Sequence, residues 1–175
     1  MTKRMMKWIK SAGGPLICLD EIWAGCWRGV SASSELEPSE ATTDYERACA
    51  TEDYVAELAT DGGRALILGD MPLETSVWSG QNTTIIRLFY ADARTDFGDL
   101  VEKIGNEVFQ NPIESTRYQI ASGRMVIFDS ALDGRDHGRN LLTFDIESGP
   151  YEILTATAKP DNRTSLLLHR FFRLN

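Results

Sequence analysis

The feature of this sequence that most limits its fold is a series of short apolar or β-branched runs, each ended by glycine, proline, asparagine or aspartate. Runs of this kind, with no helix between successive strands, indicate antiparallel pairing rather than parallel βαβ units. Residues 84–90 are β-branched and aromatic, so this run is predicted to be a central strand. The whole pattern predicts about eight short strands in an antiparallel-rich sheet.

Turn residues between neighbouring runs predict a set of hairpins. The pairs are residues 5–10 with 16–19, 54–60 with 64–68, 115–120 with 124–129, and 151–158 with 165–174. Glycine stands in the turns of the first three pairs, and it can adopt the positive φ that tight turns require. Residues 141–146 form a further candidate strand.

One clear amphipathic helix is predicted over residues 96–109, where apolar side chains recur at helical spacing. The stripe consists of Phe97, Leu100, Val101, Ile104 and Val108. Residues 44–50 carry a shorter helical signal with Thr43 or Asp44 as the N-cap, and residues 22–27 are typical of a packed turn or short helix. Together these elements predict an α+β fold in a single domain that spans residues 1–175, with an antiparallel-rich sheet and one main amphipathic helix.

The charge of the chain is concentrated in one segment. Against 18 Lys and Arg residues stand 26 Asp and Glu residues, which gives a formal net charge of −8. Residues 31–62 hold nine of these acids and a single base, Arg47, so this segment accounts for the whole excess. A concentrated negative field attracts basic partners and repels nucleic acid. The alternative is a solvated acidic loop that only aids solubility.

No set of catalytic or metal-binding groups emerges from the residue types and their spacing. The 3 cysteines include no C-x-x-C pair and are predicted to fill the core, and no glycine pair has the spacing of a phosphate loop. His169 stands at a position typical of a structural histidine in a strand. His137 follows Asp136 in a charged loop, and this pair leaves open a small-molecule-binding or enzymatic domain. We expect no cofactor and no metal.

Because no export or membrane signal is recognised in the sequence, we predict a cytoplasmic protein. Residues 1–10 are basic, but a Gly-Gly-Pro turn follows at residues 13–15 in place of the apolar stretch of a signal peptide. No apolar run approaches the roughly 20 residues that a membrane span needs. An odd number of cysteines suits a reducing compartment. We therefore expect a soluble cytoplasmic protein with no membrane partner.

Several short motifs, taken in their order along the chain, resemble the immunity protein 21 family of bacterial polymorphic-toxin systems. They are Trp8, Ser11-x-Gly13-Gly14-Pro15-Leu16, Trp27-x-Gly29, Asp44-Tyr45-x-Arg47-Ala48-Cys49, Ala65-Leu66-Ile67-Leu68-Gly69-Asp70-x-Pro72-Leu73-x-Thr75, Arg87-x-x-Tyr90-Ala91-Asp92 and Leu168-His169-Arg170-Phe171. The resemblance implies a protein that protects its producer by sequestering a cognate toxin, without cofactor or turnover.

The candidate partner-binding residues come from the acidic segment and from the matched motifs. They are Trp27, Glu35, Glu37, Glu40, Asp44, Glu46 and Arg47. A compact acidic domain is suited to cover the basic active site of a toxin, for which a nuclease is one candidate, with carboxylates in the place of phosphates. A third hypothesis is an assembly subunit whose acidic segment is incidental. The sequence leaves the oligomeric state open.

Overall fold

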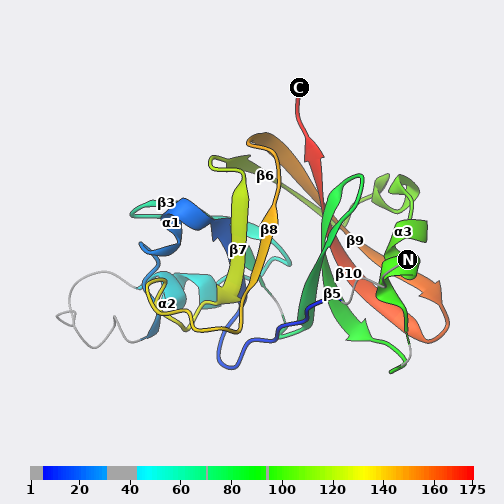
Figure 1. Cartoon of the computed structure of the whole chain (residues 1–175), viewed down its shortest axis with the longest axis horizontal. Helices are drawn as coiled ribbons and strands as arrows, with labels where there is room; N and C mark the ends of the chain where they lie inside the picture. The colour runs from blue at the N-terminus through cyan, green and yellow to red at the C-terminus, as the bar shows by residue number, and fades with distance from the viewer. Residues whose placement is uncertain (1–5, 31–42, 70, 94) are drawn as a thin grey trace.

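The computed structural model describes residues 6–30, 43–69, 71–93 and 95–175, and strands make up most of this part of the chain (Figure 1). The strands are β1 (Leu16–Asp20), β2 (Ala56–Thr60), β3 (Gly63–Leu68), β4 (Glu74–Ser79), β5 (Thr83–Tyr90), β6 (Glu114–Ile120), β7 (Arg124–Asp129), β8 (Leu142–Asp145), β9 (Gly149–Asp161) and β10 (Thr164–Arg173). The helices are α1 (Glu21–Ala24), α2 (Asp44–Cys49), α3 (Phe97–Lys103) and the 3-10 helix η2 (Asn106–Phe109). None of these helices is long and apolar enough to cross a membrane.

The strands form two antiparallel sheets of five strands each. Sheet 1 has the order β2-β3-β1-β7-β8, and sheet 2 has the order β4-β5-β10-β9-β6. The chain crosses from one sheet to the other between β3 and β4, between β6 and β7, and between β8 and β9. β1 and β10 are the central strands, and most of their side chains are buried because both faces of each sheet are covered.

An apolar core joins the inner faces of the two sheets. Its members include Leu16, Cys18, Leu66 and Met125 from sheet 1, and Ile85, Ile120, Ile153 and Phe171 from sheet 2. Phe144 of β8 meets the Phe171 ring edge-on at 6.2 Å, so an aromatic contact also links the sheets. Burial of these shared side chains is the main force that holds the sheets face to face.

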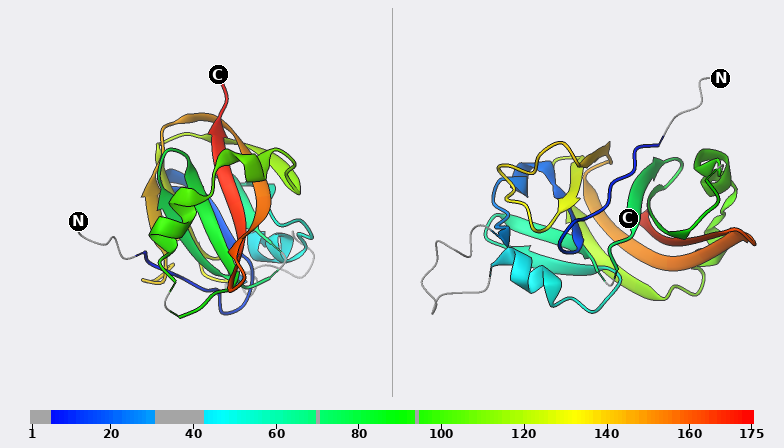
Figure 2. Two further views of the ribbon diagram at one scale, coloured as in Figure 1. Left: turned by 90° about the vertical axis from the view of Figure 1, so that its right-hand side faces the viewer. Right: turned by 90° about the horizontal axis from the view of Figure 1, so that it is seen from below.

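Each sheet is also covered on its outer face, which gives four layers. α1, α2 and the loop at residues 131–141 cover sheet 1, where Trp27 packs with Ile17 and Phe128. α3 and η2 lie across sheet 2, as the left view of Figure 2 shows, and Val101 packs with Leu166 there. The two helical layers therefore lie at opposite ends of the longest axis of the molecule (Figure 1).

Several elements predicted from the sequence are confirmed. The hairpins predicted from residues 54–60 with 64–68 and from residues 151–158 with 165–174 correspond to the pairs β2–β3 and β9–β10. The candidate central strand is β5, which lies inside sheet 2 between β4 and β10. The further candidate strand is β8, and α2 begins after Thr43 as its N-cap.

The predicted number of about eight strands in one sheet is too low, because the described residues form two sheets of five strands. The predicted hairpin between residues 5–10 and 16–19 is wrong. β1 pairs with β3 and β7, whereas Ile9 makes only an isolated bridge to Thr75. Thr75 lies in β4, a strand that the sequence pattern missed because serine, threonine and glutamate dilute its alternation. The α+β class with antiparallel strands holds at the coarse level, with two sheets in place of one.

The hairpin predicted from residues 115–120 and 124–129 is also wrong, because β6 and β7 belong to different sheets. The link between them is fixed by the buried carboxylate of Asp20. Its Oδ2 accepts the backbone N–H groups of Ala121 at 2.8 Å and of Ser122 at 2.7 Å. Asp20 also accepts the Ile22 N–H at 3.4 Å as the N-cap of α1, so one side chain fixes both the helix and the crossing.

The main helix predicted over residues 96–109 is broken in two. Ile104, with an extended ψ of 102°, and Gly105 separate α3 from η2. The buried Arg170 guanidinium stabilises this break, because it donates to the backbone oxygens of Ile104 and Gly105, both at 3.2 Å. Arg170 also lies 4.6 Å from the centroid of the Phe109 ring. A cation from β10 thus satisfies carbonyl groups at the end of α3.

Candidate functional site

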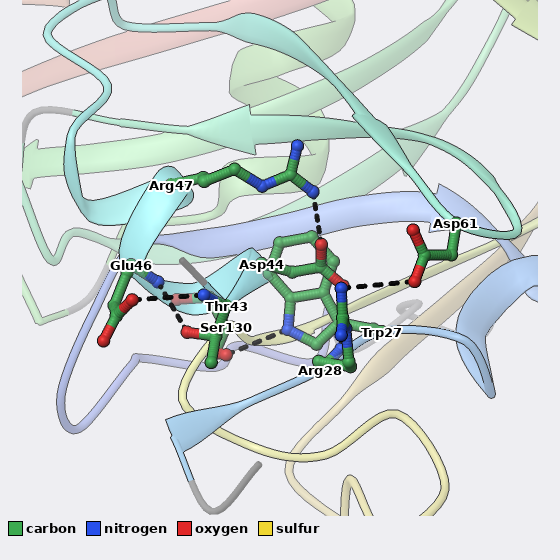
Figure 3. A network of polar contacts seen from close by, with 8 residues as sticks. All are labelled: Trp27, Arg28, Thr43, Asp44, Glu46, Arg47, Asp61 and Ser130. Atoms are coloured by element: carbon green, nitrogen blue, oxygen red, sulfur yellow. Dashed lines mark hydrogen bonds and ion pairs between the residues drawn. The ribbon is translucent and has the colours of Figure 1, made fainter. Parts of the chain in front are cut away.

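The candidate site is built around α2, whose first turn is fixed by a capping box. The Thr43 hydroxyl accepts the Glu46 N–H at 3.1 Å, and the Glu46 carboxylate accepts the Thr43 N–H at 3.1 Å (Figure 3). A box of this kind satisfies two N–H groups at the start of a helix. It also holds the exposed Glu46 carboxylate in one place at the surface.

Asp44 ties α2 to an earlier part of the chain. Its buried carboxylate accepts the Arg28 N–H at 2.9 Å through Oδ2 and forms an ion pair with Arg47 through Oδ1. The Arg28 side chain reaches Asp61, with 3.2 Å between Nη2 and Oδ2. Figure 3 shows the resulting network, which joins α2 to the segment after α1 and to the turn between β2 and β3.

Trp27, the residue before Arg28, holds this part of the chain against the core of sheet 1. Its side chain is 1% exposed, packs in the core under α1 and α2, and donates from Nε1 to the Ser130 backbone oxygen at 2.9 Å. A side chain at Gly29 would collide with the Leu132 backbone oxygen, so only glycine lets these two segments approach so closely. Trp27 therefore fixes residues 25–30 against the loop after β7.

The acidic segment carries less unpaired charge in the structure than its sequence suggests. Arg28 pairs with Asp61, and Arg64 pairs with Glu57, so bases from outside residues 31–62 neutralise part of it. Surface pairs of this kind contribute little stability, but they lower the net field. The acids that stay exposed directly after α2 are Glu52 and Asp53, which form no ion pair with any residue that the structure describes.

The structure brings part of the predicted partner-binding set together. Trp27, Asp44, Glu46 and Arg47 meet at α2. Glu35, Glu37 and Glu40 lie outside the described residues. We use the name α2 region for residues 43–61 together with Trp27 and Arg28.

The two histidines lie in different surroundings. His169 is fully buried, which confirms its predicted core position; its Nδ1 is 2.9 Å from Thr155 Oγ1, and its Nε2 has no hydrogen-bond partner among the described residues. Burial, and after it the charge of Arg87, holds the pKa of His169 well below its usual value, so the ring is neutral at physiological pH. His137 lies against the Phe128 ring at 5.1 Å between centroids.

Cysteines and acidic side chains give no metal centre in the part of the chain that the structure describes, where no group of three or more possible ligands is close enough to hold a metal ion. All three cysteines are free. Cys18 fills the core as predicted, and burial raises the pKa of its thiol. Cys26 and Cys49 are exposed, so the prediction of core filling is wrong for these two.

The fold is that of a β-rich protein with two antiparallel sheets, and the α2 region is a charged surface held by buried polar contacts. A family model described as immunity protein 21 matches residues 7–164, and the chain therefore belongs to the immunity protein 21 family. No curated protein and no solved structure matches the chain. Family membership implies a protein that gives immunity against a toxin, with that toxin as its partner and with a role other than catalysis.

Proposed function

We propose that this protein binds and neutralises a cognate bacterial toxin domain and that the α2 region forms part of the contact surface. The observation that carries the proposal is the buried Asp44 carboxylate, which fixes α2 to the Arg28 backbone and to Arg47. The Asp44 contacts therefore fix the backbone that carries the exposed acids Glu46, Glu52 and Asp53. A pre-formed surface loses less conformational entropy on binding than a mobile one.

The predicted partner-binding residues divide into two roles in this proposal. Glu46 and Arg47 reach the surface and contact the toxin, whereas Trp27 and Asp44 are buried and position them. Glu35, Glu37 and Glu40 add negative charge to the sequence just before α2. In a second group of contacts, Glu52 and Asp53 supply charge directly after α2.

The toxin surface that suits this region is a basic active cleft, of which a nuclease cleft is the clearest example. Carboxylates would take positions that phosphates occupy in the substrate, and the bound protein would exclude that substrate. An inhibitory contact of ordinary size buries about 1,600 Å². Three free cysteines support action in a reducing compartment such as the cytoplasm of the producing cell.

Calorimetric titration against the toxin domain encoded beside this protein, at two salt concentrations, tests the proposal. We expect tight one-to-one binding that weakens as salt rises, because exposed charges are screened. Loss of toxin activity should follow the same stoichiometry. A folded, active toxin domain that fails to bind would contradict the proposed function.

A charge-neutral double variant, Glu52→Gln with Asp53→Asn, tests the acidic surface itself. We expect its association rate at low salt to fall by about threefold to tenfold, with a flatter salt dependence, because steering depends on charge near the contact. The matched control is Asp99→Asn with Glu102→Gln, which removes the same charge from exposed positions on α3. Equal effects from both variants would show that only net charge matters and would remove these two acids from the contact.

A further inference from the structure

A cleft of about 420 Å³ lies beside α2. Its walls come from three segments that are distant in sequence: the turn at residues 10–15, the end of α2 with Thr51, and the loop that includes Gly69, Met71 and Pro72. The volume falls within the range of about 300–1,000 Å³ that is usual for sites that enclose a ligand group. The cleft is thus large enough to enclose one or two side chains of a partner.

The first wall, the turn at residues 10–15, is held in place by hydrogen bonds to Tyr45 and Asp129. The Tyr45 hydroxyl donates to the Gly13 backbone oxygen at 2.9 Å, and the Ala12 N–H donates to Asp129 Oδ2 at 2.6 Å. The pKa of Tyr45 is raised, first by a hydrogen bond with the Cys49 side chain and then by the negative charge that Cys49 carries once it is ionised. The phenol therefore stays protonated and remains a donor at physiological pH.

The third wall is fixed by a buried arginine. Arg87 of β5 is 1% exposed and donates to the Gly69 backbone oxygen at 2.9 Å and to the Met71 backbone oxygen at 2.5 Å. A side chain at Gly69 would collide with the Asp53 backbone oxygen, so the loop lies tight against the segment after α2. The first and third walls are therefore both held by hydrogen bonds before any partner arrives.

The lining combines apolar surface with an unused polar group. Pro15, Ala48, Met71 and Pro72 supply apolar atoms, and Met71 is 40% exposed. Ser11 also lines the cleft; it is 8% exposed, and its Oγ has no hydrogen-bond partner among the residues that the structure describes. A buried hydroxyl without a partner is uncommon in native proteins, so this one is suited to a group brought in by a ligand.

The charge next to the cleft favours a basic ligand group. Thr51 lines the cleft, and the exposed acids Glu52 and Asp53 follow it directly. The buried Asp129 carboxylate lies behind the turn at residues 12–13. Two bases stand against these three acids: Lys10 in the described lining and the buried Arg87 behind the third wall.

We propose that the cleft receives a projecting segment of the toxin that carries a basic side chain next to an apolar one. This inference rests on the proposed function and specifies one contact within it. The apolar group would fill the space next to Met71 and Ala48, and the basic group would face Glu52 and Asp53. Rigid walls and a desolvated centre are the conditions under which a few side chains dominate an interface.

Two variants at one position test the inference through toxin affinity. Cys49 is exposed, ends α2 and lines the cleft, so Cys49→Phe fills the space while Cys49→Ser preserves it. We expect Cys49→Phe to weaken toxin binding by about tenfold or more, and Cys49→Ser to stay within about twofold of the unaltered protein. Unchanged affinity of Cys49→Phe, with its fold verified by circular dichroism, would overturn the inference and favour a small ligand as the occupant.

Thiol alkylation gives a readout that does not depend on affinity. In a Cys26→Ser protein the only exposed thiol among the described residues is Cys49, because Cys18 is buried. We expect saturating toxin to slow iodoacetamide modification of Cys49 by about tenfold or more, because a filled cleft excludes the reagent. A protein with Cys26→Ser, Cys49→Ser and Asp99→Cys is the control, and its thiol on α3 should react equally fast with and without toxin.

The outcomes separate the two proposals. If the toxin binds tightly but Cys49 reacts as fast as in the free protein, the cleft is not part of the contact and the immunity function stands. If the toxin does not bind at all, the proposed function itself fails.

Discussion

α2 and α3 lie on the outer faces of two similar sheets, but different contacts fix them. α2 is fixed by directional polar contacts, namely the capping box, the Asp44 ion pair and the indole hydrogen bond of Trp27. The N-cap of α3, Asp96, makes no side-chain hydrogen bond to the start of the helix; α3 packs on sheet 2 through apolar side chains, and the directional contacts from Arg170 come where the helix ends. Directional bonds specify orientation as well as position. The comparison therefore singles out α2 as the end whose exposed charges are held in a defined arrangement.

The largest expected difference between the two ends comes from their tryptophans. Trp27→Ala should lower the free energy of unfolding by about 3–5 kcal/mol, because it leaves a cavity and an unsatisfied carbonyl on Ser130. Trp8 packs on Phe97 of α3 at 4.7 Å but is only partly buried, so Trp8→Ala should cost about 1–2 kcal/mol. Chemical denaturation of both variants measures this. Equal losses would contradict the view that the α2 end is the more tightly built.

A smaller effect is expected from carboxylates that differ in burial. Asp44→Asn should destabilise the fold by about 2 kcal/mol, because it weakens charged hydrogen bonds inside the protein. Asp92 pairs with Arg163 at 3.3 Å near sheet 2, but both side chains are exposed, so Asp92→Asn should cost less than about 0.5 kcal/mol. Thermal and urea unfolding compare the two. A loss from Asp92→Asn as large as that from Asp44→Asn would remove burial as the explanation.

Acid should weaken sheet 2 through His169. The pKa of His169 in the folded protein lies well below its usual value because of burial and Arg87, so below about pH 6.5 the unfolded chain binds a proton that the folded protein does not. Stability should therefore fall as pH drops from 7 to 5, by at most about 1.4 kcal/mol per pH unit from this group. His169→Gln should flatten that slope, while the control His137→Gln should retain it. Identical pH profiles for His169→Gln and the unaltered protein would refute the assignment.

The smallest difference is expected at the two helix starts. Thr43→Ala removes the acceptor of the Glu46 N–H and should cost about 1 kcal/mol. Asp96→Ala removes no side-chain hydrogen bond to the start of α3, so the capping contribution that it removes should be smaller. Differential scanning calorimetry resolves the two.

A single unfolding transition is also expected in all these variants, because one core joins both sheets. Two separate transitions would contradict the prediction of one domain.

The sequence predicted the features whose causes are local. Turn residues beside the apolar runs gave the hairpins β2–β3 and β9–β10, and Thr43, one of two candidate N-caps, gave the start of α2. The family resemblance is confirmed by the match over residues 7–164. These signals depend on neighbours within a few positions, so one chain is enough to recognise them.

The features that the sequence missed depend on distant partners. Asp20 turns the link after β6 into a crossing between sheets, and Arg170 separates α3 from η2, although each lies far along the chain from the residues it binds. The Arg28 pairs with Asp44 and Asp61 and the contact of Trp27 with Ser130 were missed for the same reason. No periodicity records which charged residue will be buried or what it will meet.

The position of β10 has a consequence for the order in which the molecule can be made. β10 lies between β5 and β9, yet the ribosome makes β5 first and then α3, η2, β6, β7 and β8 before it reaches β9 and β10. β5 is therefore unpaired on the side of β10 through much of translation. Pairing between strands so far apart in sequence is slow. Sheet 2 is therefore complete only when residues 164–173 have been made and have taken their place at its centre.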